Sequence, residues 1–248
     1  MLANVVTRTN GPAAVEWTEV DEPDGEVVVA VGAAGVSHPD LLMTYGRYQA
    51  AAALPFIPGA EVAGTVLRAA AGSSVAVGDR VVALTGTGGY AERVATTAAS
   101  VWRAPEGLTW SELAALPVNV FTAVFAASVR GRVAAGETVL ALGAAGGLGL
   151  ANVQVAKALG AEVVAVVRRS GHEDVIRAAG ADHVVPLASM TEDVRAVTQG
   201  RGVDVVLDPV GGEVFDDAVR LLAPGGRIVV LGFAGGSIPQ VKVNRLLL

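Results

Sequence analysis

The pattern of hydrophobic and polar positions in the first half of the chain predicts short β-strands joined by turns. Residues 26–31 form an apolar, β-branched run after a turn rich in Asp, Pro and Gly, and similar runs occupy residues 61–67 and 79–84. Residues 55–59 contain two prolines and a glycine, which predict an irregular loop. This spacing predicts a compact all-β unit that is barrel-like rather than an open sheet.

The second half of the chain changes period, because apolar strands alternate there with helical segments. These strands are apolar throughout, as expected when helices cover both faces of a parallel sheet. Strands are predicted at residues 138–142, 162–167, 183–185, 203–207 and 227–231, and helices at residues 148–159, 173–179 and 213–222. The alternation predicts a doubly wound parallel sheet.

The change of period places a domain boundary near residues 111–121, where we expect a helix to begin with Ser111 as its N-cap. The sequence therefore predicts an α/β protein with two domains. Residues 1–118 form the β-rich domain and residues 119–248 form the parallel-sheet domain.

The composition of the chain narrows the class of protein. Of 248 residues, 52% are hydrophobic and 17% are charged, so intrinsic disorder is excluded as the main state. The formal net charge is −6, which argues against nucleic acid as the main partner. The chain has no cysteine, which excludes disulfides, iron–sulfur clusters, thiolate zinc sites and a cysteine nucleophile.

Two features of the sequence concern the cellular location of the protein. The first residues lack a basic segment followed by an apolar one, so we expect no signal peptide and a cytoplasmic protein. Residues 138–156 carry no charge and are long enough to be considered as a membrane span. The glycines in their middle favour a strand, a turn and a helix instead, and we expect no membrane partner.

A glycine-rich turn at residues 143–149 links a predicted strand to a predicted helix. Glycines at such a turn let the backbone approach a pyrophosphate, whose charge is stabilised by the helix N-terminus. Ala144 stands where the usual dinucleotide-binding fingerprint has its first glycine. The alternative is a turn that serves only helix–strand packing. The candidate ligands are the backbone amides of Ala145, Gly146, Gly147 and Leu148.

The end of the next strand discriminates between the two nicotinamide dinucleotides. An NAD site usually has Asp or Glu there, for the ribose hydroxyls. This chain has Arg168, Arg169 and Ser170, whose charges and hydroxyl suit a 2′-phosphate. The pattern favours NADPH, and two solvated arginines at a strand end are the alternative.

Several segments, in unbroken order from about Val27 onward, carry a family resemblance. They include a Gly-Val-Ser-His-Pro-Asp run, a Pro-Gly-Ala-Glu turn and an Asp-Pro-Val-Gly-Gly run. The segments are residues 35–42, 46–48, 54–64, 77–81, 116–117, 122–123, 180–182, 208–212 and 225–227. As a set they resemble the zinc-independent quinone oxidoreductase (zeta-crystallin-like) branch of the medium-chain dehydrogenase/reductase superfamily.

The resemblance implies a GroES-like β-barrel domain beside a Rossmann-type NADP(H)-binding domain, with the active site in the cleft between them. Ala60 stands where a zinc-ligand His would follow Gly59, so no metal is expected. Members of the branch continue beyond the match to Leu248. We therefore expect the last Rossmann strand and the return segment to be missing, which puts the homodimer typical of the branch in doubt.

The resemblance also suggests residue roles. Tyr48 is the candidate hydrogen-bond donor to the substrate, or else an aromatic plug in the cleft wall. Asp40 would orient hydroxyls or the nicotinamide carboxamide, or else cap a helix that begins at Leu41. Thr122 would contact the nicotinamide end, with helix capping as the alternative. Val210 and Phe233 are further cofactor-binding candidates, and a core aromatic is the alternative for Phe233.

Three positions depart from the branch. Ser37 replaces the usual Asn, Leu42 stands where many members have a cofactor-contacting Tyr, and Leu187 stands where an aromatic residue or His often lies beside the nucleotide. The expected function is hydride transfer from NADPH to a small-molecule substrate, a quinone or an α,β-unsaturated carbonyl compound. The alternatives are an enoyl-thioester reductase of polyketide or fatty-acid type and a non-catalytic NADPH-binding protein.

Overall fold

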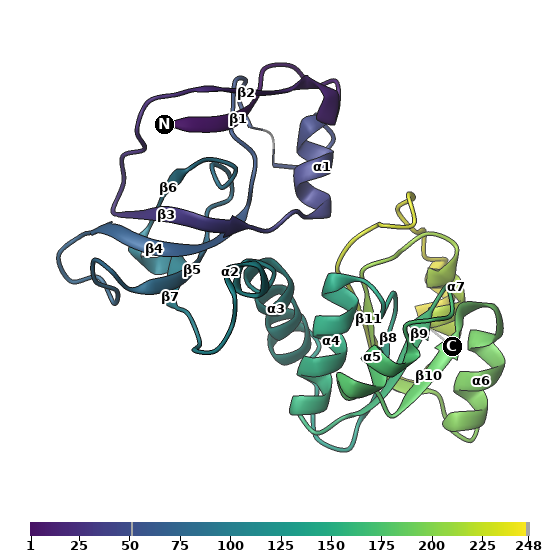
Figure 1. Cartoon of the computed structure of the whole chain (residues 1–248). Helices are drawn as coiled ribbons and strands as arrows, with labels where there is room; N and C mark the ends of the chain where they lie inside the picture. Colours follow the sequence, from purple (N-terminus) through teal and green to yellow (C-terminus); the bar gives the residue numbers. More distant parts are fainter. Residues whose placement is uncertain (51, 247–248) are drawn as a thin grey trace. The chain divides into compact units, whose positions relative to one another are not determined.

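The computed structural model describes residues 1–50 and 52–246 and divides into two compact units (Figure 1). Unit 1 is Met1–Val118 and unit 2 is Asn119–Leu248. Each unit has its own hydrophobic core, and each is described in turn.

Unit 1 is built on a five-stranded antiparallel sheet with the strand order β6-β3-β4-β5-β7, accompanied by a two-stranded β1-β2 ribbon. Its strands are β1 (Leu2–Val6), β2 (Val15–Glu19), β3 (Val27–Ala34), β4 (Glu61–Ala69), β5 (Arg80–Leu84), β6 (Arg93–Thr96) and β7 (Val101–Arg103). Its helical segments are η1 (Pro12–Ala14), α1 (His38–Thr44), η2 (Ala98–Ser100), α2 (Trp110–Ala114) and the start of α3 (Pro117–Val124).

The five-stranded sheet curls around one core. Alternate residues of β3 and β4, such as Val29 and Val62, are fully buried there. Val94 of β6 and Val101 of β7 belong to the same core, although their strands stand at opposite ends of the strand order. Because both end strands contribute to one interior, the sheet is barrel-like, and the predicted fold class is confirmed.

Two predicted helix starts in unit 1 are wrong. α1 begins at His38 rather than Leu41, because Ser37 and Asp40 form a reciprocal capping box one turn earlier. α2 begins at Trp110 with Thr109, not Ser111, as its N-cap. Thr109 and Glu112 bond each other's backbone amides in a second capping box, which satisfies two amides that Ser111 would leave unpaired.

Unit 2 contains a parallel sheet with the strand order β10-β9-β8-β11-β12. Its strands are β8 (Thr138–Ala141), β9 (Glu162–Val167), β10 (His183–Pro186), β11 (Val203–Asp208) and β12 (Leu222–Val230). Its helical segments are the rest of α3, the π-helix η3 (Phe125–Arg130), α4 (Gly147–Ala158), α5 (Glu173–Ala178), η4 (Leu187–Ser189), α6 (Met190–Val197), α7 (Val214–Arg220) and η5 (Val243–Leu246).

Helices cover both faces of this sheet. Alternate strand residues such as Val139 and Val163 pack with η3, α4 and α5 on one face. The intervening residues, such as Leu140 and Val164, pack with α6 and α7 on the other face. The predicted doubly wound parallel sheet is therefore confirmed, although α6 was not predicted and β12 begins at Leu222, where the sequence predicts the end of a helix.

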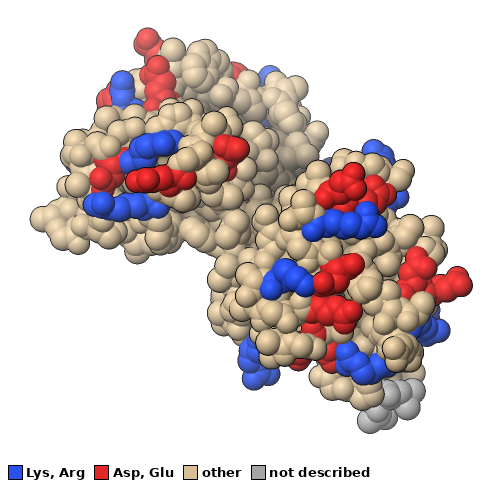
Figure 2. Space-filling view, turned by 60° about the horizontal axis from the view of Figure 1, so that its bottom comes forward, with Lys and Arg blue, Asp and Glu red and all other residues tan. Residues whose placement is uncertain are grey.

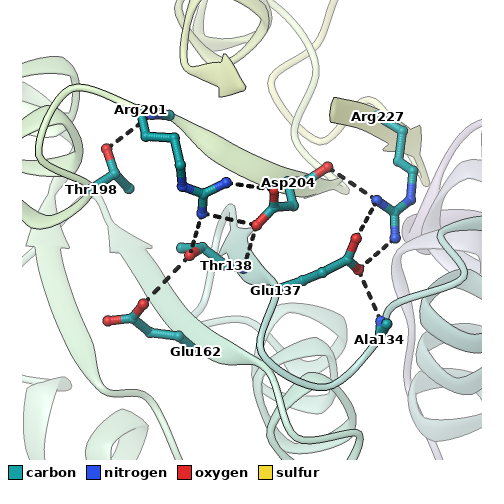
Figure 3. Close-up of polar contacts among 9 residues, drawn as sticks. Ala134, Glu137, Thr138, Glu162, Thr198, Arg201, Asp204 and Arg227 are labelled. Atoms are coloured by element: carbon teal, nitrogen blue, oxygen red, sulfur yellow. Dashed lines mark hydrogen bonds and ion pairs between the residues drawn. The ribbon is translucent and has the colours of Figure 1, made fainter. Parts of the chain in front are cut away.

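A polar network fastens the amino ends of the parallel strands (Figure 3). Asp204 of β11 accepts a hydrogen bond from the Thr138 amide of β8 at 2.8 Å and pairs with Arg201 at 2.7 Å. Arg227 of β12 pairs with Glu137 at 2.6 Å. Because Arg227 and Glu137 are both largely shielded from water, this pair is screened less than an exposed one.

The charged side chains show no segregation by sign on the face that Figure 2 shows, where basic and acidic residues lie next to one another. Exposed ion pairs such as that of Arg68 with Asp24, at 2.5 Å, also bring opposite charges together on the protein surface. Across residues 1–50 and 52–246, no helix is long and apolar enough to cross a membrane.

Candidate cofactor and substrate sites

The glycine turn of unit 2 connects β8 to α4 through a tight backbone reversal. Gly143 has a φ of 62°, and the Gly146 amide donates to the Gly143 carbonyl at 2.9 Å. A Cβ on Gly149 would overlap that same carbonyl oxygen, so only glycine allows α4 to pack this close to the turn. Ala144 is fully buried, and its amide donates to the Val166 carbonyl of β9 at 3.0 Å. Its methyl group belongs to the hydrophobic core on this face of the sheet, so the fold accommodates alanine in place of the usual glycine.

The start of α4 is open to solution. Ala145, Gly146 and Gly147 are exposed, and Leu148 is half-buried. Gly146 is the N-cap of this twelve-residue helix, whose first backbone amides have no intrahelical acceptor. The four predicted pyrophosphate ligands therefore lie together at the positive end of a helix.

Asn119 is a residue of this region that the sequence analysis missed. A Cβ on Gly147 would lie 2.9 Å from its Nδ2 atom, so the Asn119 amide group lies directly against the first residue of α4. A polar residue in the otherwise apolar run at residues 116–121 was the only signal in the sequence.

A pocket of ≈ 240 Å³ adjoins the glycine turn at the carboxyl edge of the parallel sheet. Its lining comes from the end of β9 and from the segments that follow β8, β9, β10, β11 and β12, and all of it except Arg168 is apolar. The lining residues are Leu142, Gly143, Val166, Arg168, Leu187, Val210, Val214 and Ala234. Ligands of doubly wound sheets bind at this edge.

The predicted phosphate-binding residues follow β9 directly. Arg168, Arg169 and Ser170 are all exposed, and Arg168 lines the pocket. Neither arginine forms an ion pair with any residue that the structure describes. The nearby carboxylate of Glu173 instead accepts from the Gly171 amide at 2.7 Å, and backbone hydrogen bonds lower its pKa.

Asp208 holds the turn after β11. Its side chain is fully buried, and its Oδ1 atom accepts from the amides of Val210, at 2.8 Å, and Gly211, at 2.9 Å. Burial raises the pKa of Asp208, against the effect of these two hydrogen bonds. Phe233 lies against Gly211, where a Cβ would be 3.1 Å from the ring, and remains 41% exposed. The turn therefore brings two predicted cofactor residues, Val210 and Phe233, to one region.

Thr122 lies in the middle of α3 and is half-buried. It is therefore not a helix cap, which removes the alternative role considered for it. The predicted substrate-binding residues belong to unit 1, whereas Thr122 and the other cofactor candidates belong to unit 2.

Asp40 is buried in α1 and surrounded by hydrogen-bond donors. Its Oδ2 atom accepts from the Ser37 amide at 2.8 Å and from the Ser37 hydroxyl at 2.6 Å, and its Oδ1 atom accepts from the Gly59 amide at 3.0 Å. Asp40 thus orients the hydroxyl of Ser37, at a position that departs from the branch. It also joins the segment before α1 to the loop before β4.

Tyr48 is half-buried in the irregular segment that follows α1. Of the other two tyrosines, Tyr90 donates to the Gly35 carbonyl at 3.1 Å, and burial raises its pKa, helped by the neighbouring Asp40 and Glu61. Tyr45 packs against Gly11 and carries the Arg47 guanidinium 5.5 Å from its ring centre.

Glu61 is a buried acid at the start of β4, with 2% of its surface exposed. Its Oε2 atom accepts from the Val118 amide at 2.8 Å, within the first turn of α3. Burial raises the pKa of Glu61 to about 7, since the hydrogen bond from Val118 opposes the shift only in part and the charge of Asp40 adds to it.

The chain matches two family profiles. One, described as "Alcohol dehydrogenase GroES-like domain", covers residues 23–106, and the other, described as "Zinc-binding dehydrogenase", covers residues 147–248. Despite the second description, no group of three or more His, Cys, Asp or Glu that could hold a metal ion occurs among the residues that the structure describes.

The similarity to individual proteins identifies the family more narrowly than the two profiles do. The chain is similar to the quinone oxidoreductase from Thermus thermophilus, which was solved alone and with NADPH. The two share 39% sequence identity and superpose with a TM-score of 0.85, and the match covers 100% of this chain and 77% of that one. This chain belongs to the quinone oxidoreductase branch of the medium-chain dehydrogenase/reductase superfamily. It is also 43% identical to quinone oxidoreductase-like protein 2 of Bos taurus over 227 residues. The match covers 90% of this chain and 65% of that protein.

A third relative belongs to a larger assembly. Over 213 residues the chain is 39% identical to the pikromycin polyketide synthase component PikAII of Streptomyces venezuelae, a match that covers 84% of this chain and 6% of that protein. The chain therefore spans less than two thirds of the length of the curated relatives that it matches.

Proposed function

We propose that the chain is an NADPH-dependent oxidoreductase that reduces a quinone or an α,β-unsaturated carbonyl compound. The observation that carries this proposal is the apolar pocket at the carboxyl edge of the sheet, which adjoins the glycine turn and has one basic side chain, Arg168, in its wall. NADPH, when bound, supplies the hydride. The Thermus relative, solved with NADPH, supports the choice of cofactor.

The residues of unit 2 fit this cofactor part by part. The amides of Gly147 and Leu148 in the first turn of α4 suit the pyrophosphate, because they have no intrahelical acceptor and lie at the positive end of a helix. The apolar wall formed by Val166, Leu187 and Val210 suits an adenine ring. Arg168 and Arg169, with Ser170, would bind the 2′-phosphate, for which two unpaired guanidinium groups are suited.

The nicotinamide end is assigned to residues beyond this pocket. Thr122 of α3 and Phe233 after β12 would contact it. Since hydride transfer requires two carbon atoms to be aligned, their role is positioning rather than proton transfer.

Substrate activation is assigned to unit 1. Tyr48 would donate a hydrogen bond to the substrate oxygen on which negative charge develops. Asp40 would act indirectly, since its carboxylate already accepts from Ser37 and Gly59 and orients the Ser37 hydroxyl. The chemistry proposed here uses no metal, and the absence of cysteine agrees with that.

Two other functions have support of their own. An enoyl-thioester reductase would use the same hydride chemistry, and the match to a polyketide synthase component favours it. A non-catalytic NADPH-binding protein is favoured by the departures at Ser37, Leu42 and Leu187.

The test is NADPH oxidation by the 248-residue chain, followed by the loss of cofactor absorbance, with an ortho-quinone, a simple enone and crotonyl-coenzyme A as parallel acceptors and NADH as the control. Turnover of the quinone or enone with NADPH, and much less with NADH, is the expected result. Preference for the thioester would support the enoyl reductase. Saturable NADPH binding without turnover of any acceptor would support the binding protein, and no binding would contradict all three.

A further inference from the structure

The two residues on either side of the boundary between the units are each fixed within their own unit. Val118 is the last residue of unit 1 and Asn119 is the first residue of unit 2, and both lie in the first turn of α3. The Val118 amide donates to Glu61 over 2.8 Å. The Asn119 amide group lies on Gly147, at the glycine turn. Within one helical turn, Val118 therefore contacts the carboxylate of Glu61, and the next residue, Asn119, contacts the glycine turn.

The Glu61 side chain has little freedom to move. A Cβ on Gly35 would overlap its Oε1 atom, so the carboxylate is held between the backbone before α1 and the start of α3. Because Pro117 has no backbone N–H, the Val118 amide is the first donor that α3 offers to this carboxylate.

The charged and titratable groups around Glu61 provide no cation. Asp40 of α1 and Tyr90 of the β5–β6 connection act on it, and α2, which packs on β4, contributes Glu112, an exposed residue that caps its own helix. Within the part of the chain that the structure describes, no Lys, Arg or His forms an ion pair with Glu61.

The neighbouring strands also add no charge at this position. β3 contains no titratable residue. In β5 the only one is Arg80, which is in register with Thr65, whereas Glu61 is in register with Leu84 at the other end of the strand. The ionised form of Glu61 is therefore stabilised by the Val118 amide and the positive end of α3, and burial opposes it strongly enough to bring the pKa to about 7.

We propose that Glu61 is a positioning residue for the cofactor site: its ionised carboxylate fixes the first turn of α3, and with it the Asn119 side chain at the glycine turn, so that NADPH affinity depends on whether Glu61 is charged. This inference rests on the proposed function, because it requires NADPH at that turn. An ionised carboxylate accepts a stronger hydrogen bond than a neutral one and interacts favourably with a helix N-terminus. NADPH should therefore bind more tightly above pH 7 than below it.

The test compares NADPH dissociation constants, from the change in cofactor fluorescence, at pH 6, 7 and 8. The proteins are the wild type, Glu61→Gln, which keeps an acceptor for the Val118 amide without a charge, and the matched control Glu112→Gln. Glu112 also caps a helix, but on α2, and hydrogen bonds from Thr109 lower its pKa, so its charge does not change over this range. The phosphate of the cofactor titrates equally with all three proteins and cancels when each variant is divided by the wild type at the same pH.

For Glu61→Gln, the ratio of dissociation constants should rise from about one at pH 6 to about five at pH 8, the size of a helix-terminus charge effect. For Glu112→Gln it should stay near one. A ratio for Glu61→Gln that does not change with pH would overturn the inference. A wild-type chain that binds no NADPH would overturn the proposed function first, and this inference with it.

A second variant removes the other partner of the hydrogen bond. Val118→Pro deletes the amide that donates to Glu61, and proline is tolerated in the first turn of a helix. Its ratio of dissociation constants to the wild type should rise with pH as for Glu61→Gln. If circular dichroism shows that Glu61→Gln is unfolded, Val118→Pro decides: the same pH dependence as the wild type overturns the inference.

Discussion

The candidate site of unit 2 is built mainly from backbone groups, whereas that of unit 1 is built from side chains. In unit 2 the site consists largely of backbone: a glycine turn, a helix N-terminus and the carboxyl ends of parallel strands, with side chains supplying an apolar wall and positive charge. In unit 1 it consists of polar side chains, the buried Asp40 and Glu61 and the half-buried Tyr90, which bond to backbone groups far away in sequence. A backbone-built site should withstand the loss of single side chains but not a charged residue in its glycine turn, whereas the network of unit 1 should depend on single side chains.

The largest expected effect is on the stability of unit 1. Asp40→Ala leaves three donors, the Ser37 amide and hydroxyl and the Gly59 amide, without their acceptor in a buried place. The free energy of unfolding should fall by about 3 kcal/mol, because each unpaired buried group costs about 1–3 kcal/mol and water can reach part of the site. Chemical denaturation followed by circular dichroism measures this. A loss below about 1 kcal/mol would show that the network is dispensable.

The next effect is on the glycine turn. Gly147→Glu places a Cβ against the Asn119 amide and adds a negative charge where the pyrophosphate is proposed to bind. NADPH affinity should fall at least about 100-fold, or ~2.7 kcal/mol, with the circular dichroism spectrum unchanged. Gly147→Ala is the matched control for the added Cβ alone and should cost much less, since Asn119 can shift. Equal affinity for Gly147→Glu and the wild type would remove the turn from cofactor binding.

A smaller effect is expected from the arginines after β9. Replacing both Arg168 and Arg169 by serine should reduce the preference for NADPH over NADH by about 30-fold, or ~2 kcal/mol, because two charge-assisted hydrogen bonds to the 2′-phosphate are lost. Affinity for NADH, which lacks that phosphate, should stay within about twofold. Arg177→Ser, on α5, is a control for a change of net charge. An unchanged cofactor preference would show that the two arginines are only solvated.

The same contrast explains how much of the molecule could be predicted from the sequence. In unit 2, period and apolarity located all five strands and the helix at the glycine turn, because these elements depend on local pattern. α6 was missed although Met190 and Val194 lie one turn apart and both are buried, since acidic residues between them obscured the apolar face. The start of β12 was missed because the strand has an irregular register between Leu222 and Arg227.

In unit 1 the network around Asp40 and Glu61 could not be predicted in this way. Asp40 meets Gly59 across 19 residues and Glu61 meets Val118 across 57 residues, and no local period encodes such distances. The family resemblance gave Asp40 a candidate role and includes Glu61 in its Pro-Gly-Ala-Glu turn, but only the fold shows which backbone groups these acids bond. Asn119 was missed for the same reason, because its contact with Gly147 spans 28 positions of the chain.

The smallest expected effect tests the buried charge of unit 1 through the pH dependence of stability. The pKa of Glu61 is about 7 in the folded chain and near 4.5 when the side chain is free in water, so the folded state holds a proton that the unfolded state has released between these pH values. Stability due to Glu61 is therefore present below about pH 4.5 and lost as the pH rises to about 7. Glu61→Gln abolishes this loss. The difference in free energy of unfolding between the variant and the wild type should therefore increase, in favour of the variant, by about 1–2 kcal/mol from pH 5 to pH 8. Urea unfolding of the two proteins at both pH values measures the difference, and a gain of the same size at each pH would show that Glu61 does not titrate in this range.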